Sequence, residues 1–479
     1  MVLSLVFLLL RSNKKIKYPP GPRPLPILGN LHQLPRRDTW RTLKSWHDRF
    51  GPIITVWMGS RPMVILGSFE CAKDLLEKRP FIYSSRPSYL TDGIGSDALV
   101  VGLPYGNRWR KHRFLLNTLL SRTRCEDYIK SQDLECKQLL WELLWTNDFA
   151  YQFHRFAASL SFSLAYGQRM ERGDESEVQE VDRLMRQMSD KVFLPGVAFP
   201  LLNYLPQWLA PWKKTAAWLQ ETQARFFTHQ MQKALSQSVK TWSHIVHEVA
   251  RNRREVSFNE LEMAHVVGVT YEAGSDTTAF VLETFVLVAV LQRPAVVRAQ
   301  IELDKVVGCH RMPALCDLPQ LPYLQAFVRE VLRWRPVVPG GLHHCTSQDD
   351  EYLEYQIPAG TTVIPNHWSL EYDESVFPNP HSFQPERWID NPKLPTCAFG
   401  MGRRACPGRH LAQNSLYLVI SRMLWAYDIR CVGRPPDSFA MTQGISSRPR
   451  PFAVRFHPRS HRHQSIIETE YRRHSSSRT

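Results

Sequence analysis

A glycine-framed loop near the carboxyl end, residues 399–408, constrains this chain more than any other segment. It reads FGMGRRACPG and presents Cys406 just before an expected helix. A thiolate stays deprotonated when positive charge and backbone donors compensate it, and here Arg403 and Arg404 precede the sulfur while a helix amino terminus follows it. The surrounding glycines would let the backbone turn tightly and approach a flat ligand. The loop therefore suits a cysteinate bound axially to haem iron, although a lone cysteine in a glycine turn is more often simply buried.

The loop resembles the haem-binding segment of the cytochrome P450 superfamily, which is spaced Phe-x-x-Gly-x-Arg-x-Cys-x-Gly. Five positions match, namely Phe399, Gly402, Arg404, Cys406 and Gly408. The resemblance runs from about residue 19 to residue 458. It implies a mainly α-helical fold with a small β region, one large domain, and haem b (iron protoporphyrin IX) between a long central helix and the cysteine loop. It also implies Cys406 as the axial iron ligand, with Phe399 and Arg404 as further haem contacts.

Length, charge and cysteines exclude several other classes of protein. The 479 residues show no linker and no internal repeat, so a single large domain is expected. The nine cysteines lack the paired spacing of a zinc site or a disulfide scaffold, which favours a reducing compartment. The formal net charge is +15, but no aromatic–basic nucleic-acid module appears, so no nucleic-acid partner is predicted. We interpret the charge as facing anionic lipid and an acidic protein partner.

The two ends of the chain differ from its body. Residues 2–10 are mostly apolar, and a basic group follows them, made of Arg11, Lys14, Lys15 and Lys17. A spanning helix needs about 20 residues, so this run fits either a helix lying in the membrane surface or a longer anchor cut short. The basic flank predicts a body on the cytosolic face of the endoplasmic reticulum membrane. We expect an anchor with its flank at 1–18, the catalytic domain at 19–458, and a basic, disordered tail at 459–479.

Hydrophobic patterns predict mostly helices. Two β-branched runs, 53–57 and 62–66, enclose Gly59-Ser60-Arg61 and predict a β-hairpin. Further extended pieces are expected only near 354–365 and 452–457. Helical patterns dominate from residue 70 onward and include 72–78, 108–119, 132–145 and 178–188.

The segment 193–212 is rich in apolar residues but is broken by four prolines, which forbid one regular helix. One interpretation is an irregular piece of core. The resemblance instead implies a lid between two helices that touches lipid and admits apolar substrate.

A polar sequence interrupts the long helical pattern at 259–291. Residues 273–278 read AGSDTT, and hydroxyl side chains there can bond the carbonyls of the preceding turn, so the helix should bend. An ordinary helix with a polar stripe would give the same hexapeptide. The segment resembles the oxygen-binding motif of the P450 family, which implies Thr277 as hydrogen-bond donor and Asp276 as proton carrier.

Two further segments are predicted to brace the cysteine loop. EVLR at 330–333 places Glu330 and Arg333 on one helix face, and PERW at 385–388 adds Arg387. Taken alone, the first pair says little. The family resemblance implies that the three side chains form a buried network, structural and not catalytic, which holds the loop in place.

Cationic side chains are also expected around the haem propionates. Trp109 and Arg113 lie four residues apart on one helix face, as in the family signature Trp-x-x-x-Arg. We assign both to the propionates, together with Arg404. His344 resembles a histidine or arginine that many members turn toward a propionate, although the neighbouring His343 leaves the register open.

These motifs imply a haem-thiolate monooxygenase that uses O2 and acts on an apolar small molecule. The motif style resembles microsomal enzymes of fungal secondary metabolism. The chain ends soon after the cysteine loop, so we expect electrons from NADPH to arrive through a separate NADPH-cytochrome P450 reductase. Arg110, Lys111 and Arg403 are candidates for its docking face.

Two alternatives remain at this point. The same haem could catalyse oxidative coupling, desaturation or rearrangement without net oxygen insertion. The chain could also be a non-catalytic haem-binding sensor or scaffold.

Overall fold

The computed structural model describes residues 16–90, 99–191, 199, 202, 204–206, 208–252 and 258–475. Most of the predicted anchor (1–18) and the first part of the predicted lid (193–198) lie outside the described residues.

Helices make up most of the described chain, as predicted. The amino-terminal half contains α2 (Thr39–Phe50), α3 (Phe69–Ala72), the π-helical turn η1 (Lys73–Lys78), α4 (Pro80–Tyr83), α6 (Asn107–Leu120), α7 (Arg122–Asp127), α8 (Ile129–Glu142), α9 (Phe149–Tyr166), α10 (Ser176–Lys191) and α12 (Pro211–Leu235). The remainder contains α13 (Trp242–Asn252), α14 (Glu260–Leu291), α15 (Arg293–Val306), η3 (Leu315–Gln320), α16 (Pro322–Trp334), α17 (His367–Glu371), α18 (Glu386–Asp390), η4 (Gly402–Arg404), α19 (Arg409–Ala426) and α20 (His461–Ser475).

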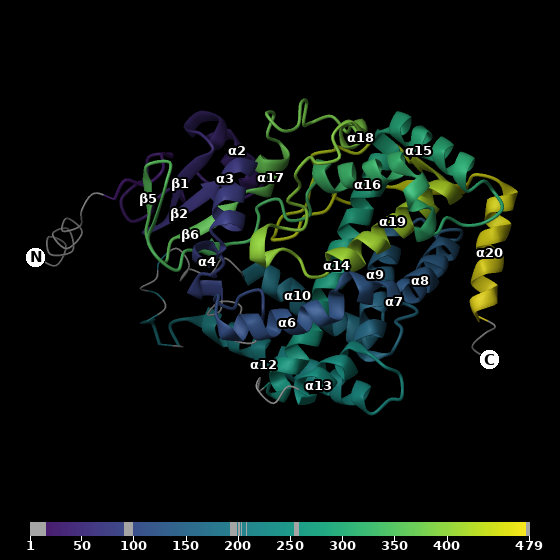
Figure 1. The fold of residues 1–479 in the computed structure, drawn as a ribbon, viewed down its shortest axis with the longest axis horizontal. Helices are drawn as coiled ribbons and strands as arrows, with labels where there is room; N and C mark the ends of the chain where they lie inside the picture. The colour runs from purple at the N-terminus through teal and green to yellow at the C-terminus, as the bar shows by residue number, and fades with distance from the viewer. Residues whose placement is uncertain are drawn as a thin grey trace, which may run out of the picture.

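The β structure is small. β1 (Ile53–Met58) and β2 (Arg61–Leu66) form the predicted antiparallel hairpin, and β2 pairs in parallel with β6 (Thr362–Pro365), which pairs with β3 (His344–Cys345). Two separate ribbons pair β4 (Asp350–Tyr352) with β5 (Tyr355–Ile357) and β7 (Tyr427–Cys431) with β8 (Val454–Pro458). Figure 1 shows the four-stranded sheet at one end of the molecule and the helical body at the other.

Helix α14 forms the centre of that body. It starts at a capping box, in which Asn259 Oδ1 accepts the backbone N–H of Glu262 and the Glu262 carboxylate accepts the N–H of Asn259. Its second half buries Leu282 and Phe285 against α9, which lies alongside (Figure 1). Within the described residues, α14 alone is long and apolar enough to cross a membrane, but 67% of its apolar window is buried inside the protein. We therefore assign it as a core helix.

The carboxyl end corrects one prediction. We expected a disordered tail from residue 459, but the chain forms α20, which packs on α8. Ile467 is fully buried, Tyr471 stacks on Trp141 with 4.3 Å between ring centroids, and Lys137 Nζ lies 2.8 Å from a Glu470 carboxylate oxygen. The many arginines and histidines obscured this apolar face in the sequence.

The described part of the predicted lid lies between α10 and α12. Tyr204 is 86% exposed and Trp208 is 75% exposed, and Leu209 is exposed as well. These three side chains are not core residues, which removes the alternative of an irregular core segment for this part of the lid.

Candidate active site

The cysteine loop is closed by its own backbone and locked against a distant turn. The N–H of Cys406 donates to the carbonyl of Phe399 at 2.8 Å. Gly402 has a left-handed backbone (φ +61°), and a Cβ there would lie 2.2 Å from the carbonyl oxygen of Leu76 in η1. Only glycine fits that approach. Helix α19 begins directly after the loop, so a helix amino terminus follows the sulfur, as predicted.

Burial raises the pKa of the Cys406 thiol, and three nearby groups oppose that effect. They are the backbone N–H of Gly408 and the positive charges of Arg113 and Arg409. A metal ion at the sulfur would deprotonate the thiol outright. The sulfur is partly exposed, and these three groups favour its thiolate form.

The arginines whose charge favours the thiolate are Arg113 and Arg409, and not the expected Arg403 and Arg404. Arg403 donates to the Tyr105 hydroxyl and lies with its guanidinium 3.8 Å from the centre of the Phe81 ring. Arg404 is turned toward the backbone between α4 and α6. Neither is among the charges that act on the sulfur, because a residue's neighbours in the sequence need not be its neighbours in a tight loop.

Arg404 is held firmly. Its Nε donates to the carbonyl of Ser84 at 2.8 Å, Nη1 to Val100 at 3.2 Å and Nη2 to Leu103 at 2.6 Å. The guanidinium also lies 4.6 Å from the centre of the Trp109 ring. Thus the predicted haem contacts Arg404 and Trp109, which come from opposite halves of the chain, lie against one another.

Arg86, Arg113 and Arg404 form an arginine cluster in the interior. Burial lowers the pKa of Arg404 to about 8, and the charges of Arg86 and Arg113 add to this effect. Burial likewise lowers the pKa of Arg86 to about 10. In the described part of the chain, none of the three is paired with a carboxylate, and Arg86 donates only to the carbonyls of Val101 and His343.

An arginine cluster of this kind needs an anion. Buried charge is costly unless it is paired, and two propionate carboxylates would supply the missing partners. His344 stands beside the cluster, with Nδ1 2.8 Å from the carbonyl of Tyr83. Burial and then the charge of Arg86 hold its pKa well below the ordinary value, so the imidazole is neutral. The residues present therefore fit a haem: a sulfur donor, a loop that Gly402 lets close tightly, and a cationic end.

The middle of α14 faces an accessible space. Ala273 is exposed and Thr277 is half-buried, although Leu282 and Phe285 farther along the helix are buried. The Thr277 hydroxyl donates to the carbonyl of Ala273 at 2.8 Å, as expected for hydroxyls in this sequence. The helix nevertheless continues without interruption from Glu260 to Leu291.

Asp276 points to a neighbouring helix. Its carboxylate lies 3.2 Å from Nε2 of His154 on α9. The two residues assigned to oxygen chemistry are thus held by different partners, Thr277 by its own helix and Asp276 by α9.

Glu330 is the centre of a buried network. It has no solvent exposure and accepts hydrogen bonds from Arg333 at 2.8 and 2.9 Å and from Arg387 at 3.2 Å. The indole N–H of Trp388 and the backbone N–H of Gln384 donate to it at 2.8 and 3.0 Å. The three charged residues predicted to meet therefore do so, with two further donors.

A second buried carboxylate holds the segment just before the loop. Glu371 of α17 accepts the backbone N–H of Cys397 at 2.8 Å and the hydroxyl of Thr396 at 3.1 Å. Burial raises the pKa of Glu371 to about 7. Its backbone carbonyl accepts from Arg333, so the Glu330 network and the cysteine loop share one support.

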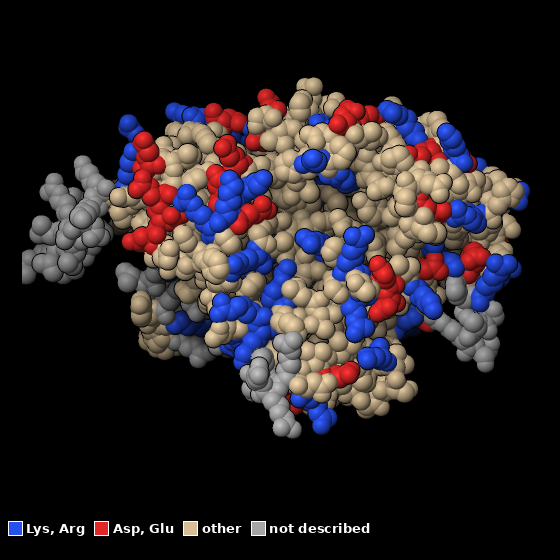
Figure 2. Space-filling model, in the orientation of Figure 1, with Lys and Arg blue, Asp and Glu red and all other residues tan. Residues whose placement is uncertain are grey.

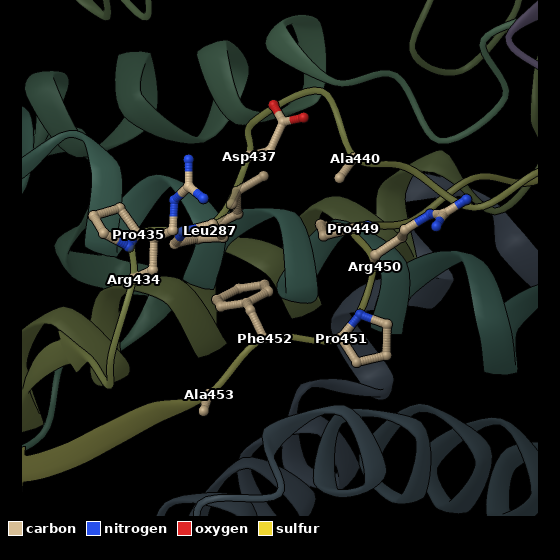
Figure 3. Close-up of a pocket in the computed structure, with 11 residues that line it drawn as sticks. Leu287, Arg434, Pro435, Asp437, Ala440, Pro449, Arg450, Pro451, Phe452 and Ala453 are labelled. Atoms are coloured by element: carbon tan, nitrogen blue, oxygen red, sulfur yellow. The ribbon is translucent and has the colours of Figure 1, made fainter.

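A cavity of about 310 Å³ lies elsewhere, and none of the residues above lines it. Figure 3 shows Leu287 of α14 facing two proline-rich loops, which carry Arg434 to Ala440 and Pro449 to Ala453.

Four residues that support the site were missed in the sequence. Arg409 directly follows the cysteine loop, and the other three are Arg86, His154 and Glu371. Arg86, His154 and Glu371 each act through a partner far away in the chain, so no local spacing marks them. A buried-looking charge in an apolar surrounding, as in FHRFAASL at 153–160, is the only signal the sequence contains for such a residue.

Glu330→Ala should destabilise the protein by about 3–5 kcal/mol, because it leaves two buried arginines without their carboxylate. The midpoint of thermal unfolding and the haem content of purified protein measure this effect. Glu354→Ala, at an exposed position, is the control and should change stability by less than about 0.5 kcal/mol. Equal stability and equal haem content in the two variants would contradict the bracing role.

Known proteins show the same organisation over nearly the whole chain. The family model of cytochrome P450 matches residues 19–456. Cytochrome P450 monooxygenase aneD of Aspergillus aculeatus is 41% identical over 484 residues, which cover 98% of this chain and 93% of that protein.

Two further relatives are similar. Cytochrome P450 monooxygenase FrzL of Cladobotryum sp is 40% identical over 472 residues, covering 96% of this chain and 91% of the relative. Fumitremorgin C synthase of Neosartorya fischeri is 37% identical over 488 residues, covering 95% and 90%. With a family match and relatives of this extent, the chain belongs to the cytochrome P450 family and is a haem-thiolate monooxygenase.

Proposed function

We propose that this enzyme inserts one oxygen atom from O2 into an apolar organic molecule in a fungal biosynthetic pathway for a secondary metabolite. Electrons would come from NADPH through NADPH-cytochrome P450 reductase. The observation that carries the proposal is the environment of Cys406, a partly exposed sulfur near the charges of Arg113 and Arg409 in a loop closed by Phe399. The pathway class is supported by the relative whose name says that it makes fumitremorgin C.

Each site residue has a role in this proposal. When bound, the haem supplies the activation of dioxygen. Cys406 would be its axial ligand, and the arginine cluster with Trp109 and His344 would hold the propionates. Thr277 would offer its hydroxyl as a hydrogen-bond donor, and Asp276 would hold and move a proton. Glu330, Arg333 and Arg387 would only brace the loop.

The reductase would meet a basic surface. On the face drawn in Figure 2, Lys and Arg side chains gather around α6, whose Arg108 and Arg110 are exposed. Positive charge attracts an acidic partner and accelerates its docking. Arg403 contributes less than expected to such a surface, because it is bound to Tyr105 and covers Phe81.

The site of action would be the cytosolic face of the endoplasmic reticulum membrane. The apolar run at 2–10 with its basic flank is one support for this proposal. The exposed Tyr204, Trp208 and Leu209 are the other, since aromatic and apolar side chains partition into the membrane interface.

A second candidate reaction has one specific support. Fumitremorgin C synthase is named for a product and not as a monooxygenase. The same site could therefore form a bond within its substrate without leaving oxygen in the product.

Cys406→Ser should abolish the thiolate spectrum of the reduced carbon monoxide complex, because the electron-donating sulfur is lost. Cys397→Ser is the matched control, since that buried thiol contacts Glu371 and carries no assigned role at iron. A thiolate spectrum that survives in Cys406→Ser would refute the assignment.

Incubation with a reductase, NADPH, 18O2 and a panel of apolar substrates should give product that carries one labelled atom. Mass spectrometry measures the label. Omitting the reductase should reduce NADPH-dependent product to background. Product without label would favour the second candidate, and the absence of substrate-dependent NADPH consumption would favour a non-catalytic role.

Trp208→Ser should weaken binding to liposomes that contain anionic lipid, because an exposed aromatic side chain is removed from the interface. Co-sedimentation of the purified protein measures the bound fraction. Trp145→Ser, another exposed tryptophan beyond the lid, is the control. Equal binding by both variants would count against membrane contact at the lid.

A further inference from the structure

One imidazole joins three helices next to the site. His154 Nε2 on α9 lies 3.1 Å from a carboxylate oxygen of Asp182 on α10 and 3.2 Å from one of Asp276 on α14. All three side chains are partly accessible, with 20%, 30% and 27% of their surfaces exposed. The cluster therefore connects the residue before Thr277 with the outside of the protein.

The charges around this imidazole favour its protonated form. Burial lowers the pKa of His154, but the hydrogen bonds to Asp182 and Asp276 outweigh burial and raise the pKa to about 9. Glu283 of α14 also faces His154, although its carboxylate is bonded to Arg448 at 2.8 Å. One proton on Nε2 thus serves two carboxylates that would otherwise repel each other.

Asp276 has another acidic neighbour on its own helix. Glu272 lies one turn earlier, where burial raises its pKa to about 7 and Gln223 donates to it at 2.9 Å. Asp276 is therefore close to Asp182, Glu272 and Glu283, and it is paired with the imidazole of His154. Without that partner the carboxylate would turn away or take up a proton.

Asp182 also connects the cluster to α10 and, through that helix, to α12. Its helix, α10, contacts α12 on the other side of the lid, where the Arg183 guanidinium lies 5.6 Å from the centre of the Trp218 ring. Glu177 of α10 lies 3.8 Å from Lys233 Nζ of α12. A movement of α10 relative to α9 would therefore change the distance between Asp182 and His154.

We propose that His154 is a positioning residue that fixes the Asp276 carboxylate beside Thr277, and that Asp182 makes this hold depend on the position of α10. The inference rests on the proposed function, because Asp276 matters only if protons are delivered there. In this role His154 holds Asp276 in place and takes part in no chemical step. The two carboxylates share the one N–H of Nε2.

The first test measures stability and needs no turnover. Thermal unfolding of the wild-type holoenzyme and of His154→Gln is followed from pH 6 to pH 10. A folded-state pKa raised above 6.5 stabilises the protein below pH 6.5, and this contribution disappears as the pH rises through about 9. The melting temperature of the wild type should therefore exceed that of His154→Gln at pH 6.5, and the difference should shrink toward pH 10.

The second test measures the coupling of electrons to product. In His154→Gln, product formed per NADPH should fall about tenfold, less than the 10²–10⁴-fold that a general acid contributes. The reduced carbon monoxide spectrum should be unchanged, because Cys406 is untouched. In Asp182→Asn, the pH at which coupling is lost should move to lower values, since one of the two carboxylates that keep His154 charged is gone.

A matched control separates this effect from a general loss of histidine charge. His457→Gln changes an exposed histidine on β8 and should leave coupling and its pH profile as in the wild type. Wild-type coupling in His154→Gln, or a melting difference that does not change with pH, would overturn the role of His154. An unshifted pH profile in Asp182→Asn would overturn the link to α10.

The two proposals can fail separately. If the wild type makes no oxygenated product, the proposed function fails, while the unfolding titration still reports whether His154 holds Asp276.

Discussion

The buried carboxylate of Glu330 is the interaction on which the rest of the site depends. Two arginines, an indole and a backbone amide converge on it from α16, α18 and the loop between α17 and α18. Such a network stabilises only if every charge is matched. Because Arg333 also bonds the backbone of Glu371, whose side chain holds Cys397, the network reaches the cysteine loop through one more residue.

The site joins two electrostatic environments of opposite sign. Near the cysteine, Arg86, Arg113 and Arg404 leave positive charge that a dianionic cofactor would neutralise. Around His154, the carboxylates of Asp182 and Asp276 outnumber the one imidazolium and leave excess negative charge. The part of the site that would hold the negative propionates is therefore cationic, and the part that would hold the proton relay is anionic.

Local patterns revealed the hairpin and many of the helices, whereas the overall fold and the outline of the site were expected from the family resemblance. The hairpin at 53–66 was predicted from alternation and glycine spacing, which act over a few residues. The meeting of Glu330 with Arg387, which lie far apart in the chain, was predicted only because the family resemblance implies it. Arg86, His154 and Glu371 could not be found this way, since their partners lie far away in the chain. Helix α20 was wrongly predicted as disordered, because its charged residues outnumber the few apolar ones that bury against α8. Arg403 shows the same limit. It lies close to Cys406 in the sequence, but its guanidinium is bound to Tyr105 and does not act on the sulfur.

The contact between Gly402 and Leu76 sets an order of assembly. The loop can close only against a turn from the amino-terminal part of the chain, and a side chain at position 402 would prevent that approach. During synthesis, η1 and the hairpin before it leave the ribosome long before the loop does, so they must wait for their partner. Long-range contacts of this kind form late because the closure of a long loop is entropically costly. The loop that carries Cys406 thus takes its final shape only when it packs against η1, which lies far earlier in the chain.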